Sequence, residues 1–303
     1  MKKTVLNKPV TIFILSLFLL LASVALFPEV TAALFDEDQA IYYVEQQLSF
    51  GPRTPESEGH AKFVSWATEQ LTNSGWNVRH HTGELPNREE FTNIIAQREN
   101  AGEDKPWILL AAHYDTRIFA DSDPDPENRS KPVPGANDGA SGVAVLLELA
   151  SSLPKTLDKN LWIVLFDAED QGRISGWDNW CLGSAALAET LAKSEKQPDA
   201  VVVVDMIGDK NLEIYREQNS TGSLTDEIWE VAAAEGYGHI FINEEKYRIL
   251  DDHVPFLQAG IPAVDIIDFD YPAWHTVADD IGNVSKDSLA IVGNVLYSWL
   301  TKE

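Results

Sequence analysis

Short apolar runs alternate with helical patterns along most of this chain. Nearly unbroken apolar runs occupy 107–112, 161–166, 201–204 and 263–267. Such runs are typical of strands that are covered on both faces, as in a parallel sheet. Apolar residues at helical spacing predict helices at 37–50, 56–75, 139–153, 184–192, 225–234 and 286–300. The alternation predicts an α/β fold, with a mostly parallel twisted central sheet and helices on both faces.

Two further strands are expected before this alternation begins. Residues 77–84 and 91–97 have strand patterns, and Pro86-Asn87 between them predicts a turn. No internal repeat and no long low-complexity linker divides the rest of the chain. The sequence therefore predicts a single catalytic domain at 35–303.

The first 32 residues differ in character from the rest. Lys2, Lys3 and Lys8 precede an apolar run at 11–27, and small residues follow at 30–32. This layout is typical of a signal peptide for export, with an uncleaved N-terminal membrane anchor as the alternative. Either interpretation places the catalytic domain outside the cytoplasm, as a secreted, periplasmic or membrane-anchored protein.

Composition narrows the range of partners. The formal net charge of −25 argues against nucleic acid and against an anionic membrane surface, which both require a basic face. A membrane tether is expected only through the N-terminal segment. The chain has one cysteine, Cys181, so it forms no internal disulfide, and this side chain is expected to pack inside.

Acidic residues and histidines follow each of the four central strands. His113 and Asp115 follow the first, an acidic segment at 167–170 follows the second, Asp205 follows the third, and His275 lies beyond the fourth. In open α/β sheets, ligands bind outside the carboxyl ends of the strands. The pattern predicts a functional site at that edge.

Zinc is the metal that these residue types suggest. Zinc takes about four ligands from His, Asp, Glu or Cys, and a catalytic site leaves one position open. With one cysteine available, the ligands must be carboxylates and imidazoles, and the candidates are Asp138, Asp170 and His275. The alternative for Asp138 is an N-cap of the helix predicted at 139–153.

Six motifs in order resemble the zinc aminopeptidase clan, which contains di-zinc aminopeptidases and single-zinc glutaminyl cyclases. They are His113-Tyr114-Asp115, Gly135-Ala136-Asn137-Asp138, Ala168-Glu169-Asp170, Asp205-Met206-Ile207-Gly208, Asp252-His253 and Trp274-His275-Thr276. The resemblance covers nearly all of 40–303. Within the clan, HYDTRIFADSDPD at 113–125, WCLGS at 180–184, the acid Asp251 and Trp274 before His275 resemble bacterial glutaminyl cyclases.

The resemblance implies a ligand set and leaves the number of ions open. It assigns one zinc ion to Asp138, Asp170 and His275. In the di-zinc relatives, His113 and Asp205 would hold a second ion bridged by Asp138. One zinc is therefore expected for a cyclase and two for an aminopeptidase.

The resemblance also implies a reaction. A glutaminyl-peptide cyclotransferase, an acyltransferase, converts the N-terminal Gln of peptide or protein substrates to pyroglutamate and releases ammonia. Glu169 would shuttle the proton, and Asp205 and Asp251 would form an acidic group that raises its pKa. The expected substrate-binding residues are Trp274, Tyr271, Trp177 and Trp180. In the alternative, a di-zinc aminopeptidase, Glu169 would activate a water that hydrolyses N-terminal residues from peptides.

Three acids alternate in the segment that resembles cyclases. Asp121, Asp123 and Asp125 are separated by single residues. We expect them to lie on a solvated lid over the site, with calcium ligation as the alternative.

Overall fold

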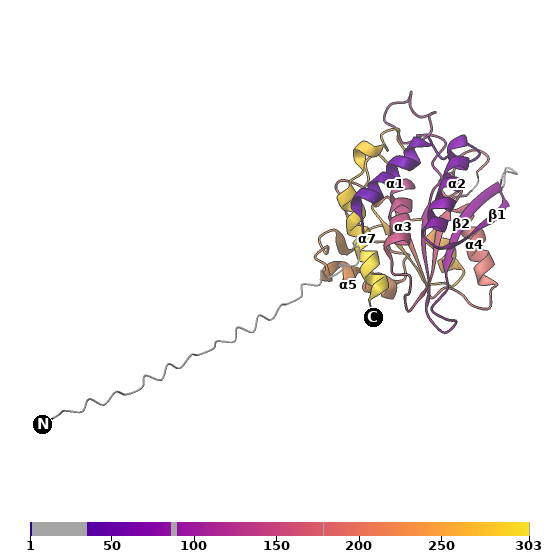
Figure 1. Ribbon diagram of the computed structural model, residues 1–303. Coiled ribbons are helices and arrows are strands. Elements are labelled where there is room, and N and C mark those ends of the chain that lie inside the picture. The colour runs from indigo at the N-terminus through magenta and orange to yellow at the C-terminus, as the bar shows by residue number, and fades with distance from the viewer. Residues whose placement is uncertain (2–34, 86–89, 178, 303) are drawn as a thin grey trace. The chain divides into compact units, whose positions relative to one another are not determined.

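The computed structural model describes all residues except 2–34, 86–89, 178 and 303 (Figure 1). Apart from Met1, the predicted signal peptide or anchor thus lies outside the described residues. The predicted turn at Pro86-Asn87 also lies outside them. The described residues from Phe35 to Lys302 form one compact unit. Within the described part of the chain, no helix is both long and apolar enough to cross a bilayer.

A six-stranded sheet forms the centre of this unit. Its order is β1 (Asn77–Glu84), β2 (Glu90–Arg98), β4 (Asn160–Phe166), β3 (Trp107–His113), β5 (Ala200–Asp205) and β8 (Ala263–Ile267). Strands β4, β3, β5 and β8 pair in parallel, whereas β1 and β2 are antiparallel to their neighbours. Every residue of the parallel strands is buried, which explains their nearly unbroken apolar sequences. The predicted α/β fold is confirmed.

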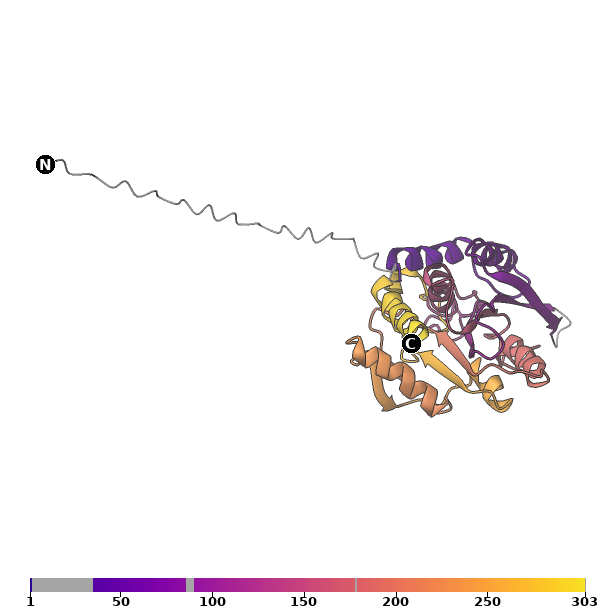
Figure 2. The ribbon, with the colours of Figure 1, turned by 60° about the horizontal axis from the view of Figure 1, so that its bottom comes forward.

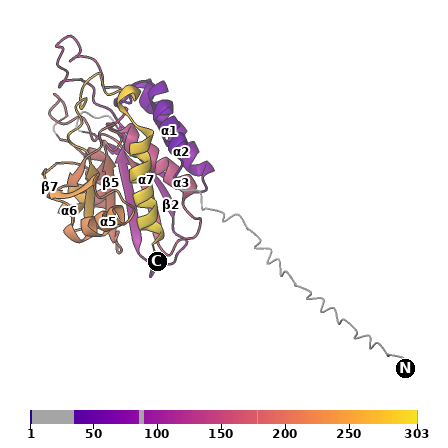
Figure 3. The ribbon, with the colours of Figure 1, turned by 90° about the vertical axis from the view of Figure 1, so that its left-hand side faces the viewer.

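Helices cover both faces of the sheet, as predicted. One face packs against α1 (Glu37–Ser49), α2 (Glu58–Asn73), α3 (Ala140–Ser152), α5 (Gly222–Ala234) and α7 (Lys286–Thr301). The other packs against α4 (Leu182–Ala192) and α6 (His253–Gln258). Figure 2 shows indigo α1 and α2 on one side of the strands and pink α4 on the other, and Figure 3 shows α1, α2 and α7 together. Side chains alternate between the two cores along each strand; Leu110 belongs to the first and Leu109 to the second.

Local sequence explains where the first helices begin. Asp36 accepts the backbone N–H groups of Asp38 (3.0 Å) and Gln39 (3.1 Å) as the N-cap of α1. Ser57 accepts the N–H of His60 (3.0 Å) as the N-cap of α2. Both caps satisfy donors that have no partner within the helix.

Several short elements were not predicted from the sequence. They are β6 (Ile214–Arg216) and β7 (Phe241–Glu245), which form a separate parallel pair, the six-residue α6, and the 3₁₀ turn η1 (Ile281–Asn283). None is long enough to show a clear period in the sequence. Helix α6 also contains Pro255, which is tolerated because it lies in the first turn.

The strand register aligns the chemistry-bearing residues at one edge of the sheet. His113 pairs with Phe166, directly before the acidic segment at 167–170, and Asp205 pairs with Ile267 on β8. Because these strands are parallel, the residues that follow them emerge on the same side.

Candidate metal and catalytic site

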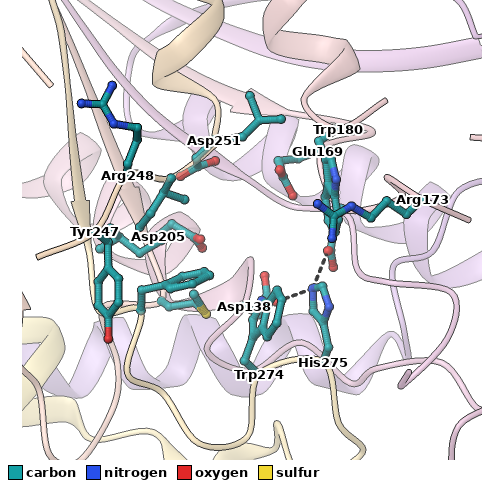
Figure 4. Close-up of a pocket in the computed structure, with 16 residues that line it drawn as sticks. Asp138, Glu169, Arg173, Trp180, Asp205, Tyr247, Arg248, Asp251, Trp274 and His275 are labelled. Carbon is teal, nitrogen blue, oxygen red and sulfur yellow. Dashed lines mark hydrogen bonds and ion pairs between the residues drawn. The ribbon is translucent and has the colours of Figure 1, made fainter. Parts of the chain in front are cut away.

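A cavity of ≈ 250 Å³ opens at this edge of the sheet. In Figure 4 the carboxylates of Asp138, Glu169, Asp205 and Asp251 point toward a common space, with Trp274 and His275 beside it. The described lining residues are Asp138, Glu169, Asp170, Arg173, Trp180, Asp205, Met206, Tyr247, Arg248, Ile249, Leu250, Asp251, Ile267, Phe269, Trp274 and His275. The candidates from different strand ends thus converge in one cavity.

Asp138, Asp170 and His275 offer a complete set of ligand atoms. One ligand atom from each lies within 4.8 Å of the others, and all three side chains are buried. Nε2 of His275 lies 2.9 Å from Oδ1 of Asp170 and 3.6 Å from Oδ2 of Asp138. Oδ2 of Asp138 and Oδ2 of Asp170 have no hydrogen-bond partner among the described residues. Buried carboxylate oxygens without donors fit a bound cation, and the donor set fits zinc.

A second group shares Asp138 with the first. Nε2 of His113 lies 3.1 Å from Oδ1 of Asp138 and 3.2 Å from Oδ1 of Asp205. These three residues also lie within ligand reach of one another. Asp138 therefore stands between the two groups, with one oxygen directed to His113 and the other to His275.

The backbone around Asp138 is fixed by a buried carboxylate. Asp279 accepts the N–H groups of Asn137 (2.8 Å) and Asp138 (3.1 Å). Helix α3 begins at Ala140, its N-cap is Gly139, and no side chain caps it. The alternative interpretation of Asp138 as an N-cap is therefore wrong, because its carboxylate faces the histidines instead.

A turn after β4 presents Glu169 and Asp170. Asp115 accepts their backbone N–H groups, at 2.9 Å and 3.2 Å, and the Nε2–H of Gln171 at 3.0 Å. Ala168 begins this turn with φ of 56°, a conformation that costs energy outside glycine and is maintained by the surrounding bonds. The sequence marked Asp115 only as an acid at a strand end, and the structure shows that it organises this turn.

Glu169 lies in an acidic group with Asp251 and Cys181. Ligand-type atoms of the three lie within 4.8 Å of one another, and Sγ of Cys181 donates to Oε1 of Glu169 at 3.3 Å. Burial and the charges of Asp251 and Asp170 raise the pKa of Glu169 well above its ordinary value. Burial, with the charge of Asp251 adding to it, also raises the pKa of Asp205 to about 7. Cys181 is buried, as predicted.

Two of the four expected aromatic residues line the cavity. Trp274 stacks on His275 with ring centroids 3.8 Å apart, and Trp180 stacks on the same imidazole at 5.9 Å. Tyr271 instead donates its hydroxyl to Asp279 at 2.8 Å, and its ring is buried in an apolar cluster with Met206 and Ile267. Trp177 packs in a separate apolar cluster. Neither Tyr271 nor Trp177 is among the described lining residues.

The outer part of the cavity was missed from the sequence. Tyr247, Arg248, Leu250, Phe269 and Arg173 line it. The first three lie within four positions before Asp251, so their closeness in sequence to a candidate residue was the available signal.

Of the three acids expected on a solvated lid, Asp121 and Asp125 are exposed, whereas Asp123 is buried. Asp123 is 3% exposed and accepts the N–H groups of Asp125 (2.9 Å) and Val277 (3.0 Å). Asp121 pairs with Arg117. The carboxylates of Asp121 and Asp123 thus have partners from the protein itself.

Comparisons with known proteins agree with this geometry. The family model described as "Peptidase family M28" matches residues 93–300. Glutaminyl-peptide cyclotransferase from Boiga irregularis is 26% identical over 245 residues, which cover 69% of this chain and 65% of the relative. The chain thus spans less than two thirds of the length of that relative.

Solved structures match over a larger share of the chain. A glutaminyl cyclase from Bacteroides thetaiotaomicron has a TM-score of 0.83 and 32% identity, covering 89% of this chain and 99% of its own. A structure described as a leucine aminopeptidase precursor from the same species has a TM-score of 0.84 and 32% identity, covering 90% and 99%. The fold and site therefore define a zinc exopeptidase-like α/β protein. The chain belongs to peptidase family M28.

Proposed function

We propose that this protein is a zinc-dependent glutaminyl-peptide cyclotransferase. Its substrates are peptides or proteins with N-terminal Gln, and its products are pyroglutamyl peptides and ammonia. The observation that carries the proposal is the convergence of Asp138, Asp170 and His275 beside Glu169 in one small cavity. The similarity to a solved glutaminyl cyclase over 89% of the chain supports it.

In this proposal, Asp138, Asp170 and His275 hold one zinc ion. When bound there, zinc supplies a Lewis acid that polarises the side-chain amide carbonyl of the substrate. The unpartnered oxygens of Asp138 and Asp170 support this position for the ion.

Glu169 moves the proton that the reaction must transfer. The α-amine of the substrate attacks the Cδ carbon of its own side-chain amide, so a C–N bond forms within the substrate. Glu169 takes a proton from this amine and returns it to the departing amide nitrogen, which leaves as ammonia when its C–N bond breaks. The raised pKa of Glu169 suits both steps, since the group must gain and lose a proton near neutral pH.

Asp205 and Asp251 support Glu169 from the same cavity. Both carboxylates face the same space as Glu169, and the negative charge of Asp251 favours the protonated form of Glu169. Trp274 and Trp180 form the aromatic wall that binds the glutamine side chain. The wall also excludes water, which matters because the nucleophile is the substrate itself and a competing water would hydrolyse the amide.

Incubation with matched peptides tests the proposal. A Gln-Ala-Ala peptide is expected to release ammonia and keep its chain length, whereas a Leu-Ala-Ala peptide is expected to remain intact. Free leucine without ammonia release would contradict the cyclase and support the second candidate.

The second candidate is a di-zinc aminopeptidase. The complete group of His113, Asp138 and Asp205 favours it, as does the similarity to a structure described as an aminopeptidase precursor. In that case Glu169 activates water for peptide hydrolysis. Metal analysis separates the candidates, since the cyclase is expected to hold one zinc ion per chain and the aminopeptidase two.

We further propose that residues 35–303 act as one exported catalytic domain. The basic and apolar pattern at 1–32 supports export by a signal peptide or an N-terminal anchor. Fractionation of cells that produce the full chain tests this, and activity confined to the cytoplasm would contradict it.

A further inference from the structure

Arg117 connects three parts of the site without lining the cavity. Its guanidinium is buried, and Nε and Nη2 donate to the two oxygens of Asp121 at 2.9 Å and 2.6 Å. Nη1 donates to the backbone carbonyl of Asp170 at 2.8 Å. One planar group therefore fixes both a candidate ligand and a neighbouring carboxylate.

Asp121 faces the second ring nitrogen of His275. Its Oδ1 lies 3.6 Å from Nδ1, while Nε2 of the same ring faces Asp170 and Asp138. An acceptor beside Nδ1 favours the proton on that nitrogen and leaves the Nε2 lone pair for a metal ion.

The loop that carries Asp121 is bonded to the segment that carries His275. The N–H of Ser122 donates to the carbonyl of His275 at 3.2 Å, and Asp123 accepts the N–H of Val277 at 3.0 Å. These bonds set the position of Asp121 relative to the imidazole. His275 has φ of 55°, so its backbone is in a strained conformation that requires such support.

The same guanidinium also contacts the aromatic wall. It lies over the ring of Trp180 at 4.8 Å, and Trp180 stacks on His275 with an interplanar angle of 12°. Arg117 therefore reaches His275 by two routes, through the carboxylate of Asp121 and through the indole.

We infer that Arg117 and Asp121 are positioning residues that preorganise Asp170 and His275 for the metal ion. The inference rests on the metal site of the proposed function, and it concerns residues that touch neither the ion nor the substrate. It also gives a role to Asp121, an acid of the segment at 113–125 that the proposed reaction itself does not use.

Zinc affinity measured on the full chain tests this inference. Asp121→Asn and Arg117→Gln are expected to weaken binding of zinc alone about 10-fold to 100-fold, the usual effect of losing an outer partner of a metal ligand. Arg117→Lys keeps the positive charge but not the bidentate pairing with Asp121, so we expect an intermediate loss of zinc affinity. The measurement is competition with a chromophoric chelator, together with thermal unfolding of each metal-free protein.

Two matched variants control for the chemical change. Arg98 also lies over an indole, that of Trp76 at 4.1 Å, and does not line the cavity, so Arg98→Gln should leave zinc affinity unchanged. Asp226 pairs with Arg216 on the surface, so Asp226→Asn should behave likewise.

Zinc affinity within twofold of wild type for Asp121→Asn overturns the inference, whatever happens to the unfolding temperature. Asp121 is about half exposed, so this variant tests the point even if Arg117→Gln does not fold. A wild-type chain that binds zinc but releases no ammonia from Gln peptides refutes the proposed cyclase, and the affinities still decide the role of Arg117 and Asp121.

Discussion

The carboxylate of Asp115 holds the backbone N–H of Glu169 at 2.9 Å, directly before the candidate ligand Asp170. The next N–H, that of Asp170, binds the second oxygen of the same carboxylate at 3.2 Å. In the proposed reaction, adjacent residues of this turn therefore serve different chemistry, because Glu169 transfers the proton and Asp170 binds the metal ion.

Asp115→Asn should impair both stability and activity. The amide would direct an NH₂ group at a backbone N–H, so at least one buried donor would lose its acceptor, at a cost of about 1–3 kcal/mol. Chemical denaturation should show a lower free energy of unfolding, and ammonia release should slow. Asp199→Asn is the control. Asp199 lies away from the site and accepts the N–H of Trp107 at 2.8 Å, so this variant is expected to lose stability but to keep its kcat.

Glu169→Gln should remove most of the activity while the protein still binds zinc. Loss of general acid–base catalysis typically lowers the rate about 10²-fold to 10⁴-fold. Ammonia release from a Gln peptide and zinc content by atomic absorption measure the two effects. Full activity in the variant would refute the proton shuttle, and Glu189→Gln on the exposed surface of α4 controls for the substitution.

Tyr271→Phe tests whether this residue supports the site instead of binding substrate. The variant loses the hydrogen bond to Asp279, so the free energy of unfolding should fall by about 0.5–1.5 kcal/mol. KM for Gln peptides should stay close to wild type, whereas Trp274→Leu should raise it, because Trp274 lines the cavity. A large rise in KM for Tyr271→Phe alone would contradict this assignment.

We expect the stability of the protein to depend on pH through Glu148, which does not belong to the candidate site. Burial raises its pKa to about 7 in the folded protein, compared with an ordinary value of 4.5. The folded state thus binds more protons between these values, and the contribution of Glu148 to stability falls as the pH rises from about 4.5 to about 7. The change in unfolding temperature caused by Glu148→Gln should therefore be more favourable at pH 8 than at pH 4, as measured by thermal unfolding. The same difference at both pH values would contradict this.

The parallel part of the sheet could be predicted from the sequence because both its faces are buried. Strands such as 161–166 consist of apolar residues alone, which indicates two-sided packing, and the acids that follow mark the carboxyl edge. The sequence predicted that Asp138, Asp170 and His275 converge, because these residues are expected at the carboxyl edge of the sheet and belong to motifs that resemble known ones.

What could not be predicted depends on contacts between distant segments. Tyr271 and Trp177 are aromatic residues near the candidate ligands in sequence, but the direction of their side chains depends on Asp279 and on the cluster of Leu85 and Phe91. The bonds of Asp115 and Arg117 to backbone groups likewise leave no periodic pattern. Short elements such as β6 carried too few residues to be recognised.

The ligand atoms of Asp170 and His275 approach within 2.9 Å although 105 positions separate the two residues along the chain. No local fragment of the polypeptide holds both, so high affinity for the ion requires the ordered native sheet. By mass action, an ion that binds only the folded form stabilises it by an amount that grows with its concentration. A higher concentration of free zinc would then slow the degradation of the protein by proteases that attack the unfolded form.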